Sequence, residues 1–243
     1  MRSIQNQTTR TTQILICTST PSGYILNVGA ACAVPVLENP LRSDIATDWN
    51  FALASTDASF VTLAHQDDVY DRAYLETMKH LAAAHPEFVM AFTAYRELTD
   101  QSLRPVNLNL RVKRGLCNRA FADHAAISSP TAKRRLLNLG NPICCPSVML
   151  NRQRLPDFRF SSSFKTNLDW DAWTRLSAQD GEFVYSRQAL VRKRVHAESE
   201  TTVTIASNVR KNEDLRMFRR FWPKPVAALI AAVYSLGYLS NRI

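Results

Sequence analysis

Paired carboxylates close behind a buried strand constrain this chain more than any other feature of its sequence. Residues 60–63 are mostly apolar and predict a buried strand of an α/β sheet, and Asp67 and Asp68 lie just after it. Ligands of open α/β sheets bind outside the carboxyl ends of the strands. The two carboxylates therefore predict a cation site that substrate phosphates complete. The alternative is a solvated turn in which Asp71 caps the helix expected over residues 71–85.

Composition bounds the class of protein and its partners. The 243 residues suffice for one large domain or two small ones. A net charge of +9 and a sequence pI near 9.6 predict an anionic partner, such as nucleic acid, a membrane surface or a phosphorylated substrate. The six glycines form no Gly-rich phosphate-binding loop, so any nucleotide must be held in another way.

The cysteines and the N-terminal residues indicate the compartment. The chain has five cysteines, an odd number without a C-x-x-C pair, which favours neither a disulfide framework nor a zinc site. Cys144 and Cys145 stand in an apolar run and are expected to be buried free thiols. Residues 1–10 lack the apolar core of a signal peptide. These features favour a reducing, cytoplasmic location.

The pattern along the chain predicts a largely parallel sheet covered by helices, because strands and helices alternate through its first half. Residues 97–141 show no clear period and are expected to form irregular connections. The expected strands cover residues 13–17, 34–37, 60–63, 88–93, 147–150, 182–185 and 190–195. The expected helices cover residues 44–55, 71–85, 168–179 and 202–221.

A further carboxylate, Asp169, stands at the start of the helix expected over residues 168–179. Backbone N–H groups and the helix dipole favour an ionised carboxylate at this place. Trp170, Trp173 and Leu176 share one face of the helix and are expected to pack beneath the sheet. An oriented, ionised carboxylate beside a cleft suits a general base that deprotonates a hydroxyl. The alternative is an ordinary capped amphipathic helix.

Five stretches in collinear order resemble the family 2 glycosyltransferases of the GT-A fold. They are residues 48–54, 60–70, 141–149, 169–176 and 194–201. The resemblance implies a GT-A-like α/β domain that moves a sugar from a nucleotide-diphosphate-sugar to an acceptor hydroxyl. It also implies Mg²⁺ or Mn²⁺ as the cofactor.

The resemblance assigns roles to the two acidic segments. Asp67 falls on the last acidic residue of the family's D-x-D metal motif, and Asp68 follows it as a donor-binding residue. His65 takes the first acidic position, where a neutral imidazole can bind Mn²⁺, whereas oxygen ligands suit Mg²⁺ better. A hydrogen bond from His65 to ribose or solvent is the alternative. Asp169 falls on the catalytic base, and Leu168 replaces the glutamate that usually precedes it.

Three further residues are assigned to the donor in the same way. Arg194 and His196 match an Arg-x-His that lies near the diphosphate, so that Arg194 would pair with phosphate and His196 would complete the metal shell. The alternative is an edge strand that carries solvated basic residues. Asn50 falls near a position that faces the nucleotide, although an Asn in the middle of a helix can equally be solvated.

The implied function is that of an inverting glycosyltransferase, since a single direct displacement inverts the anomeric carbon. Its partners would be a nucleotide-sugar donor and a glycan or lipid-linked acceptor, in the synthesis of a surface polysaccharide. One alternative is a catalytically weak or inactive relative that serves as a partner subunit. Another is a basic nucleic-acid-binding protein, but the basic residues are dispersed and no nucleic-acid-binding motif is present, so no nucleic acid is expected.

The two ends of the chain carry separate expectations. The family begins with a strand, a helix and a second strand that ends in acidic residues, and the residues before position 13 are too few for the first strand and its helix. We therefore expect an N-terminally truncated nucleotide-binding half with weakened nucleotide binding, and Met1 need not be the true start. Residues 1–221 are expected to form the GT-A-like domain. Residues 222–243 are expected to form an apolar helix that contacts the inner face of the membrane or packs on the domain.

Overall fold

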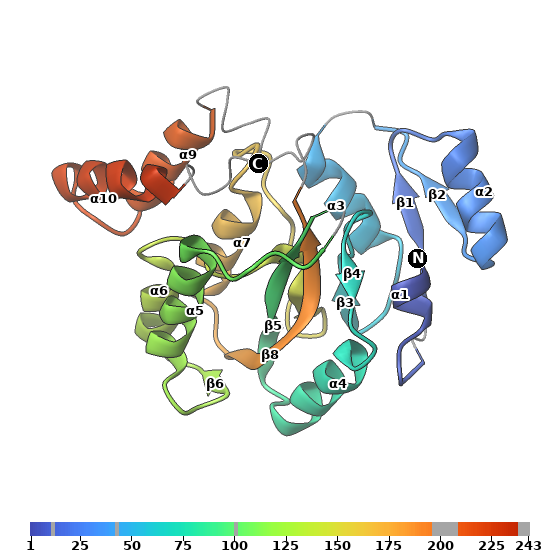
Figure 1. Cartoon of the computed structure of the whole chain (residues 1–243), viewed down its shortest axis with the longest axis horizontal. Coiled ribbons are helices and arrows are strands. Elements are labelled where there is room, and N and C mark those ends of the chain that lie inside the picture. Colours follow the sequence, from blue (N-terminus) through green and yellow to red (C-terminus); the bar gives the residue numbers. More distant parts are fainter. Residues whose placement is uncertain (11–12, 42–43, 100–101, 196–208, 238–243) are drawn as a thin grey trace.

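The computed structural model describes residues 1–10, 13–41, 44–99, 102–195 and 209–237. They form the expected α/β fold, in which a central sheet is flanked by helices (Figure 1). The strands are β1 (Ile16–Thr18), β2 (Val36–Glu38), β3 (Phe60–Thr62), β4 (Val69–Tyr70), β5 (Phe88–Leu98), β6 (Ala126–Ile127), β7 (Val148–Asn151) and β8 (Glu182–Arg194). The helices are α1 (Arg2–Gln5), α2 (Gly23–Cys32), α3 (Ile45–Ala54), α4 (Tyr74–Ala84), α5 (Leu108–Phe121), α6 (Pro130–Leu137), α7 (Leu168–Leu176), α9 (Val209–Phe218) and α10 (Lys224–Leu236).

A six-stranded sheet forms the centre of the fold. Its order is β3-β7-β5-β8-β4, and β6 also pairs with β8. β5 and β8 run parallel, whereas β3 and β7, β5 and β7, β4 and β8, and β6 and β8 are antiparallel pairs. This corrects the expectation of a largely parallel sheet. Hydrophobic patterns reveal that strands exist, but their direction depends on which distant segment supplies the neighbouring backbone.

The N-terminal segment forms a strand–helix–strand unit, in which β1 and β2 run parallel and α2 connects them (Figure 1). The sequence pattern predicts both strands but not the helix between them. Ser22 caps α2 by accepting a hydrogen bond from the N–H of Ile25 at 3.3 Å. Gly29 lets β2 pack closely, because a Cβ there would lie 2.4 Å from a methyl carbon of Val36. The expectation that a first strand and its connecting helix are missing is therefore corrected, and the second strand of this unit ends at Glu38.

Residues 97–141 were expected to be irregular, but they contain α5 and α6. Asn107 caps α5 by accepting the N–H of Leu110 at 2.8 Å, and Pro130 opens α6. The buried face of α5 is narrow, and the basic residues around it obscure the helical period. The two strands expected between residues 182 and 195 are likewise one continuous strand, β8.

α9 and α10 lie at the end of the molecule opposite to the β1–α2–β2 unit (Figure 1). Ala227 of α10 is fully buried. The ring of Tyr234 lies against Trp170 and Phe218, with ring centroids 6.1 and 5.4 Å apart respectively. One face of α10 therefore packs on the core that α7 and α9 share.

Phe221 and Trp222, just before α10, also pack against this core. Nε1 of Trp222 donates a hydrogen bond to the carbonyl of Asn138 at 2.7 Å, and the guanidinium of Arg134 lies over the Phe221 ring. The indole N–H of Trp222 and the ring of Phe221 thus make their contacts within the fold. Among the described residues, no helix combines the length and apolar character needed to cross a bilayer.

Candidate functional site

The acidic turn between β3 and β4 is tied to the end of β8. Asp68 Oδ1 accepts a hydrogen bond from the backbone N–H of Arg194 at 2.9 Å, and the Asp67 carbonyl accepts one from Nε of Arg194 at 3.1 Å. β4 leaves the turn and pairs with β8, with Val69 opposite Arg192. Asp67, Asp68 and Arg194, which were predicted from separate motifs, therefore meet at the carboxyl end of β8.

Burial changes the chemistry of Asp68. Its side chain is only 2% exposed. Desolvation raises the pKa of its carboxyl to about 6, although the hydrogen bond from Arg194 lowers it. Asp68 Oδ2 is buried and accepts no hydrogen bond from any residue that the structure describes. A buried carboxylate oxygen without a hydrogen bond is costly, and a cation or a donor group of a ligand would remove that cost.

His65 lies beside this oxygen. Its ring stacks on Trp49, with centroids 5.4 Å apart and planes inclined by 28°. Burial lowers the pKa of His65 to about 4, so the imidazole is neutral at pH 7. Nδ1 lies 3.9 Å from Asp68 Oδ2, too far for a hydrogen bond. Nε2 is buried and has no hydrogen-bond partner in the described part of the chain, so a neutral ring nitrogen remains for a ligand or a metal.

The donor atoms of the turn fit a divalent cation that a substrate also holds. Within the described ranges, no three His, Cys, Asp or Glu side chains converge on a complete protein cage. A cation in a phosphate site needs only one or two carboxylates, because phosphate oxygens and water complete its shell. Asp67 and Asp68 Oδ2 supply such carboxylates, and the neutral ring of His65 lies beside Asp68. His196, the third predicted metal ligand beside Asp67 and His65, lies outside the described residues.

Asp169 stands in the first turn of α7, as expected. Its Oδ1 accepts a hydrogen bond from the backbone N–H of Trp170 at 2.7 Å, and its Oδ2 accepts one from Nδ2 of Asn141 at 2.9 Å. Burial raises the pKa of this carboxyl, although the Trp170 N–H and nearby cations lower it. Asp169 is thus a carboxylate with a fixed orientation and increased basicity, as a general base requires.

The segment in front of α7 is clamped by an acidic residue of α9 that sequence analysis did not single out. Glu213 accepts four hydrogen bonds, from Lys165 N, Thr166 N, Thr166 Oγ1 and Asn167 N, at 2.7, 2.9, 2.7 and 3.1 Å. Asn167 Nδ2 in turn donates to Asp214 Oδ1 at 2.8 Å. This clamp fixes the start of the helix that carries the candidate base.

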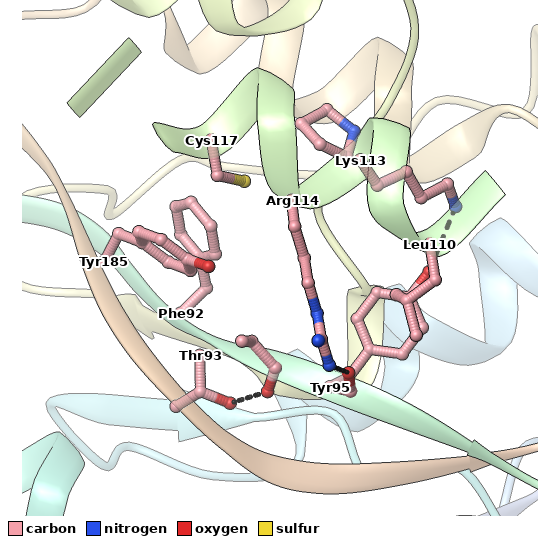
Figure 2. A pocket seen from close by; sticks show the side chains of 10 residues that line it. Phe92, Thr93, Tyr95, Leu110, Lys113, Arg114, Cys117 and Tyr185 are labelled. Atoms are coloured by element: carbon pink, nitrogen blue, oxygen red, sulfur yellow. Dashed lines mark hydrogen bonds between the residues drawn. The ribbon is translucent and has the colours of Figure 1, made fainter. Parts of the chain in front are cut away.

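The charges of two lysines act on the acidic centres. The charge of Lys193 lowers the pKa of both Asp68 and Asp169, against the larger effect of burial, so the two carboxylates share one electrostatic neighbourhood. Lys113 of α5 donates to Tyr95 Oη at 3.2 Å (Figure 2), and burial lowers its pKa to about 8. The charge of Asp169 also acts on Lys113. Positive charge around partly desolvated carboxylates suits a polyanionic ligand such as a diphosphate.

Polar residues at the ends of β1 and β2 add a third part that sequence analysis missed. Asp48 of α3 accepts hydrogen bonds from Ser19 Oγ and from Asn39 Nδ2, each at 2.8 Å. Glu38, the last residue of β2, is exposed beside them. Because ligands bind at the carboxyl ends of parallel strands, this corner extends the site. The sequence signal was the polar pair Glu38 and Asn39, which follows the apolar residues of β2. This signal becomes informative only once β2 is recognised as the second strand of the β1–α2–β2 unit.

Asn50, predicted to face the nucleotide or solvent, has a different contact. Its Nδ2 donates to the carbonyl of Phe160, and its Oδ1 accepts the N–H of Phe160, each at 2.8 Å. This paired contact anchors the segment between β7 and α7 to α3. A role for Asn50 in donor binding stays a prediction.

Comparison with solved structures identifies the structural class as the GT-A glycosyltransferase fold. No family model matches the sequence, and no curated protein matches it either. At 12–14% sequence identity, the structural likeness establishes the fold.

Three particular structures illustrate the likeness. S. aureus TarS 1-349 matches with a TM-score of 0.61 and 12% identity, over 95% of this chain and 64% of that one. The same protein in complex with UDP-GlcNAc matches with a TM-score of 0.61 and 13% identity, over 96% and 66%. Mannosyltransferase PcManGT from Pyrobaculum calidifontis, in complex with GDP-Man and Mn²⁺, matches with a TM-score of 0.63 and 14% identity, over 99% and 65%. The chain thus spans less than two thirds of the length of these proteins.

Proposed function

We propose that this chain transfers a sugar from a nucleotide-diphosphate-sugar to an acceptor hydroxyl. The proposal rests above all on one observation: in a GT-A fold, the charge of Lys193 acts both on Asp68 in the acidic turn and on the candidate base Asp169. The similar structures were solved with UDP-GlcNAc or with GDP-Man and Mn²⁺, which supports a donor of this class and a divalent metal, Mg²⁺ or Mn²⁺.

The acidic turn would hold the donor. Asp67 and Asp68 would bind the metal together with His65, and the guanidinium of Arg194 would pair with the diphosphate through its planar fork. The bound metal would neutralise the negative charge that gathers on the leaving diphosphate. The exposed carboxylate of Glu38, at the end of β2, would accept hydrogen bonds from the nucleoside.

Asp169 would remove the proton of the acceptor hydroxyl. Asn141 and the N–H of Trp170 hold both of its oxygens, so the carboxylate keeps its direction as the proton arrives. Its raised pKa makes it a stronger base than an exposed aspartate. One base and one leaving group suffice for a single displacement, and we propose that the transfer inverts the anomeric carbon as the family 2 resemblance implies.

An activity assay with a matched variant tests this function. The purified chain is incubated with Mn²⁺ and UDP-GlcNAc or GDP-mannose, and release of nucleoside diphosphate is measured with and without glycan acceptors. Asp169→Asn should reduce the release by about 10²–10⁴-fold while donor affinity persists, because the amide keeps the shape and removes the base. Asp157→Asn, at an exposed position, is the control and should keep full activity.

The same assay, together with binding titrations of the donor and of mixed DNA, separates the alternatives. Donor binding without turnover in the unaltered chain would favour a non-catalytic partner subunit. Salt-dependent binding to mixed DNA, without selective binding of a nucleotide-sugar, would favour the nucleic-acid-binding alternative. Undiminished turnover in the Asp169→Asn variant would move the base elsewhere.

We also propose that α10 rests on the cytoplasmic face of a membrane, near a lipid-linked acceptor used in surface polysaccharide synthesis. Its inner face packs on the core, but its outer face is apolar and exposed. The outer face consists of Val226, Leu229, Val233 and Leu236. Lys224 at the start of the helix and Arg219 before it are exposed, and their charges complement anionic lipids.

A further inference from the structure

A basic cavity lies against the sheet, and its lining residues differ from those proposed for the donor and the base. Its volume is about 310 Å³, and its charged lining consists of Arg96 from β5, Arg114 from α5 and Arg187 from β8. Asn118 and Tyr185 add an amide and a hydroxyl. Among the described residues that line the cavity, none carries a carboxylate.

An irregularity in β8 builds this cavity. Ser186 and Ala189 of β8 both pair with β5. The two residues between them have no pairing partner in β5, and Arg187 is the first of these two. Extra residues of this kind bend a strand and redirect its side chains. Arg187 and Arg96 are exposed at the mouth, whereas Tyr185 is buried. The cavity therefore combines an open, charged entrance with a buried polar group.

Two of the guanidinium groups are held by backbone carbonyls, which orients them but uses few of their donors. Arg114 Nη2 donates to the carbonyl of Tyr95 at 3.1 Å (Figure 2), and Arg187 Nη2 donates to the carbonyl of Ala122. A guanidinium has five N–H donors, so most remain for a ligand. Arg114 Nε is buried and has no hydrogen-bond partner among the residues that the structure describes. An acceptor atom of a ligand would satisfy it.

We propose that Arg96, Arg114 and Arg187 bind a phosphate group in a site separate from the donor site. Like charges around one cavity repel one another, and a dianion offsets that repulsion. The planar forks of arginine pair bidentately with phosphate oxygens. The cavity lies at the lower end of the range for small-molecule sites, about 300–1,000 Å³, so it admits a phosphate ester of sugar size. Asn118 and Tyr185 would then hydrogen-bond the hydroxyls of such an ester.

Calorimetric titration of the full chain tests the proposal, with inorganic phosphate, glucose 1-phosphate and glucose as probes. Both phosphates should bind and glucose should not. Tighter binding of glucose 1-phosphate would assign a phosphorylated small molecule to the site, and tighter binding of inorganic phosphate would assign free phosphate. Saturating UDP should leave the binding unchanged, because the donor site uses other residues.

Two variants and a control locate the binding. Arg96→Gln should weaken phosphate binding by about tenfold or more, the loss expected for a hydrogen bond between charged groups. The Arg96 side chain makes no hydrogen bond or ion pair within the described residues, so this variant should fold normally. Arg187→Gln should weaken phosphate binding by a similar factor. This variant also loses the hydrogen bond to Ala122, so its thermal unfolding is measured as well. Arg135→Gln, at an exposed position of α6, removes one positive charge elsewhere and should bind as the unaltered chain does.

Three results would overturn the proposal. The first is no phosphate binding to the unaltered chain. The second is unchanged binding in both Arg96→Gln and Arg187→Gln, or an equal loss in Arg135→Gln, which would indicate a general effect of charge. The third is displacement of phosphate by UDP, which would place the phosphate in the donor site.

Discussion

Replacement of Glu213 by alanine should destabilise the chain and loosen the start of α7. The Glu213 carboxylate accepts four hydrogen bonds from the three residues directly before the helix, at distances from 2.7 to 3.1 Å. In Glu213→Ala these donors lose their acceptor at a position where Glu213 itself is 5% exposed and Asn167 is 2% exposed. Water therefore replaces the carboxylate only in part.

The expected cost follows from the number of bonds. Four bonds at about 1 kcal/mol each amount to about 4 kcal/mol, and the side-chain freedom that Glu213 no longer loses on folding returns about 1 kcal/mol. The net destabilisation is therefore about 3 kcal/mol. For a chain of this size that corresponds to a decrease in Tm of about 6–12 °C. Three of the four bonds go to Oε2, so Glu213→Gln, which keeps one acceptor oxygen, should lose less stability than Glu213→Ala.

Urea unfolding of the three proteins at several pH values measures this cost and its origin. Burial raises the pKa of Glu213, but its hydrogen bonds outweigh burial and hold the pKa below the ordinary value of 4.5. A depressed pKa means that the carboxylate stabilises the fold fully above about pH 4.5 and loses that contribution as pH falls through the folded-state pKa. The stability difference between the unaltered chain and Glu213→Gln should therefore shrink below pH 4.5. The charge of Glu213 also raises the pKa of Asp214, so the titration of Asp214 contributes to this pH dependence.

Two results would refute this reasoning. A loss of less than about 1 kcal/mol in Glu213→Ala would show that the four bonds exchange with water at little cost. A stability difference between the unaltered chain and Glu213→Gln that stays constant across the acidic range would show that the charge of Glu213 contributes nothing.

Three further predictions concern the metal, the core and the membrane. Asp67→Ala should abolish Mn²⁺-dependent binding of nucleoside diphosphate in calorimetry, and unchanged affinity would remove Asp67 from the metal site. Gly140→Ala should destabilise the chain by about 2 kcal/mol or more and so lower its urea midpoint. Gly140 has φ +135°, and an added Cβ would lie 2.6 Å from the Tyr234 ring; an unchanged midpoint would contradict this. Leu229→Asp should reduce sedimentation with anionic vesicles, whereas Leu26→Asp on α2 should not, and equal sedimentation of both variants would exclude α10 as the contact.

Local signals in the sequence predicted the positions of the main acidic groups. Asp67 and Asp68 follow an apolar strand and Asp169 opens an amphipathic helix, and the structure places them at those points. The buried state of Cys144 and Cys145 was also predicted correctly from the apolar run around them. Each of these predictions uses only neighbours along the chain, because side-chain periodicity and helix-start chemistry are local.

Contacts between distant segments were not predictable in this way. The hydrogen bond from Asn141 to Asp169 and the clamp of Glu213 on residues 165–167 join segments that no local pattern relates. The helix α2 was missed because its apolar residues surround the helix with little asymmetry. Such features depend on which surfaces meet when the chain becomes compact.

The sequence by itself determined that the chain forms an α/β fold with carboxylates at a strand end and at a helix start. Only the tertiary structure decided that β5 and β8 run parallel among antiparallel neighbours, that Arg194 closes the turn at Asp68, and that Lys193 acts on both carboxylates. The physical reason is that hydrophobic periodicity reports the burial of each segment separately. Strand direction, pKa and the meeting of charges depend instead on desolvation and on partners brought together from distant parts of the chain.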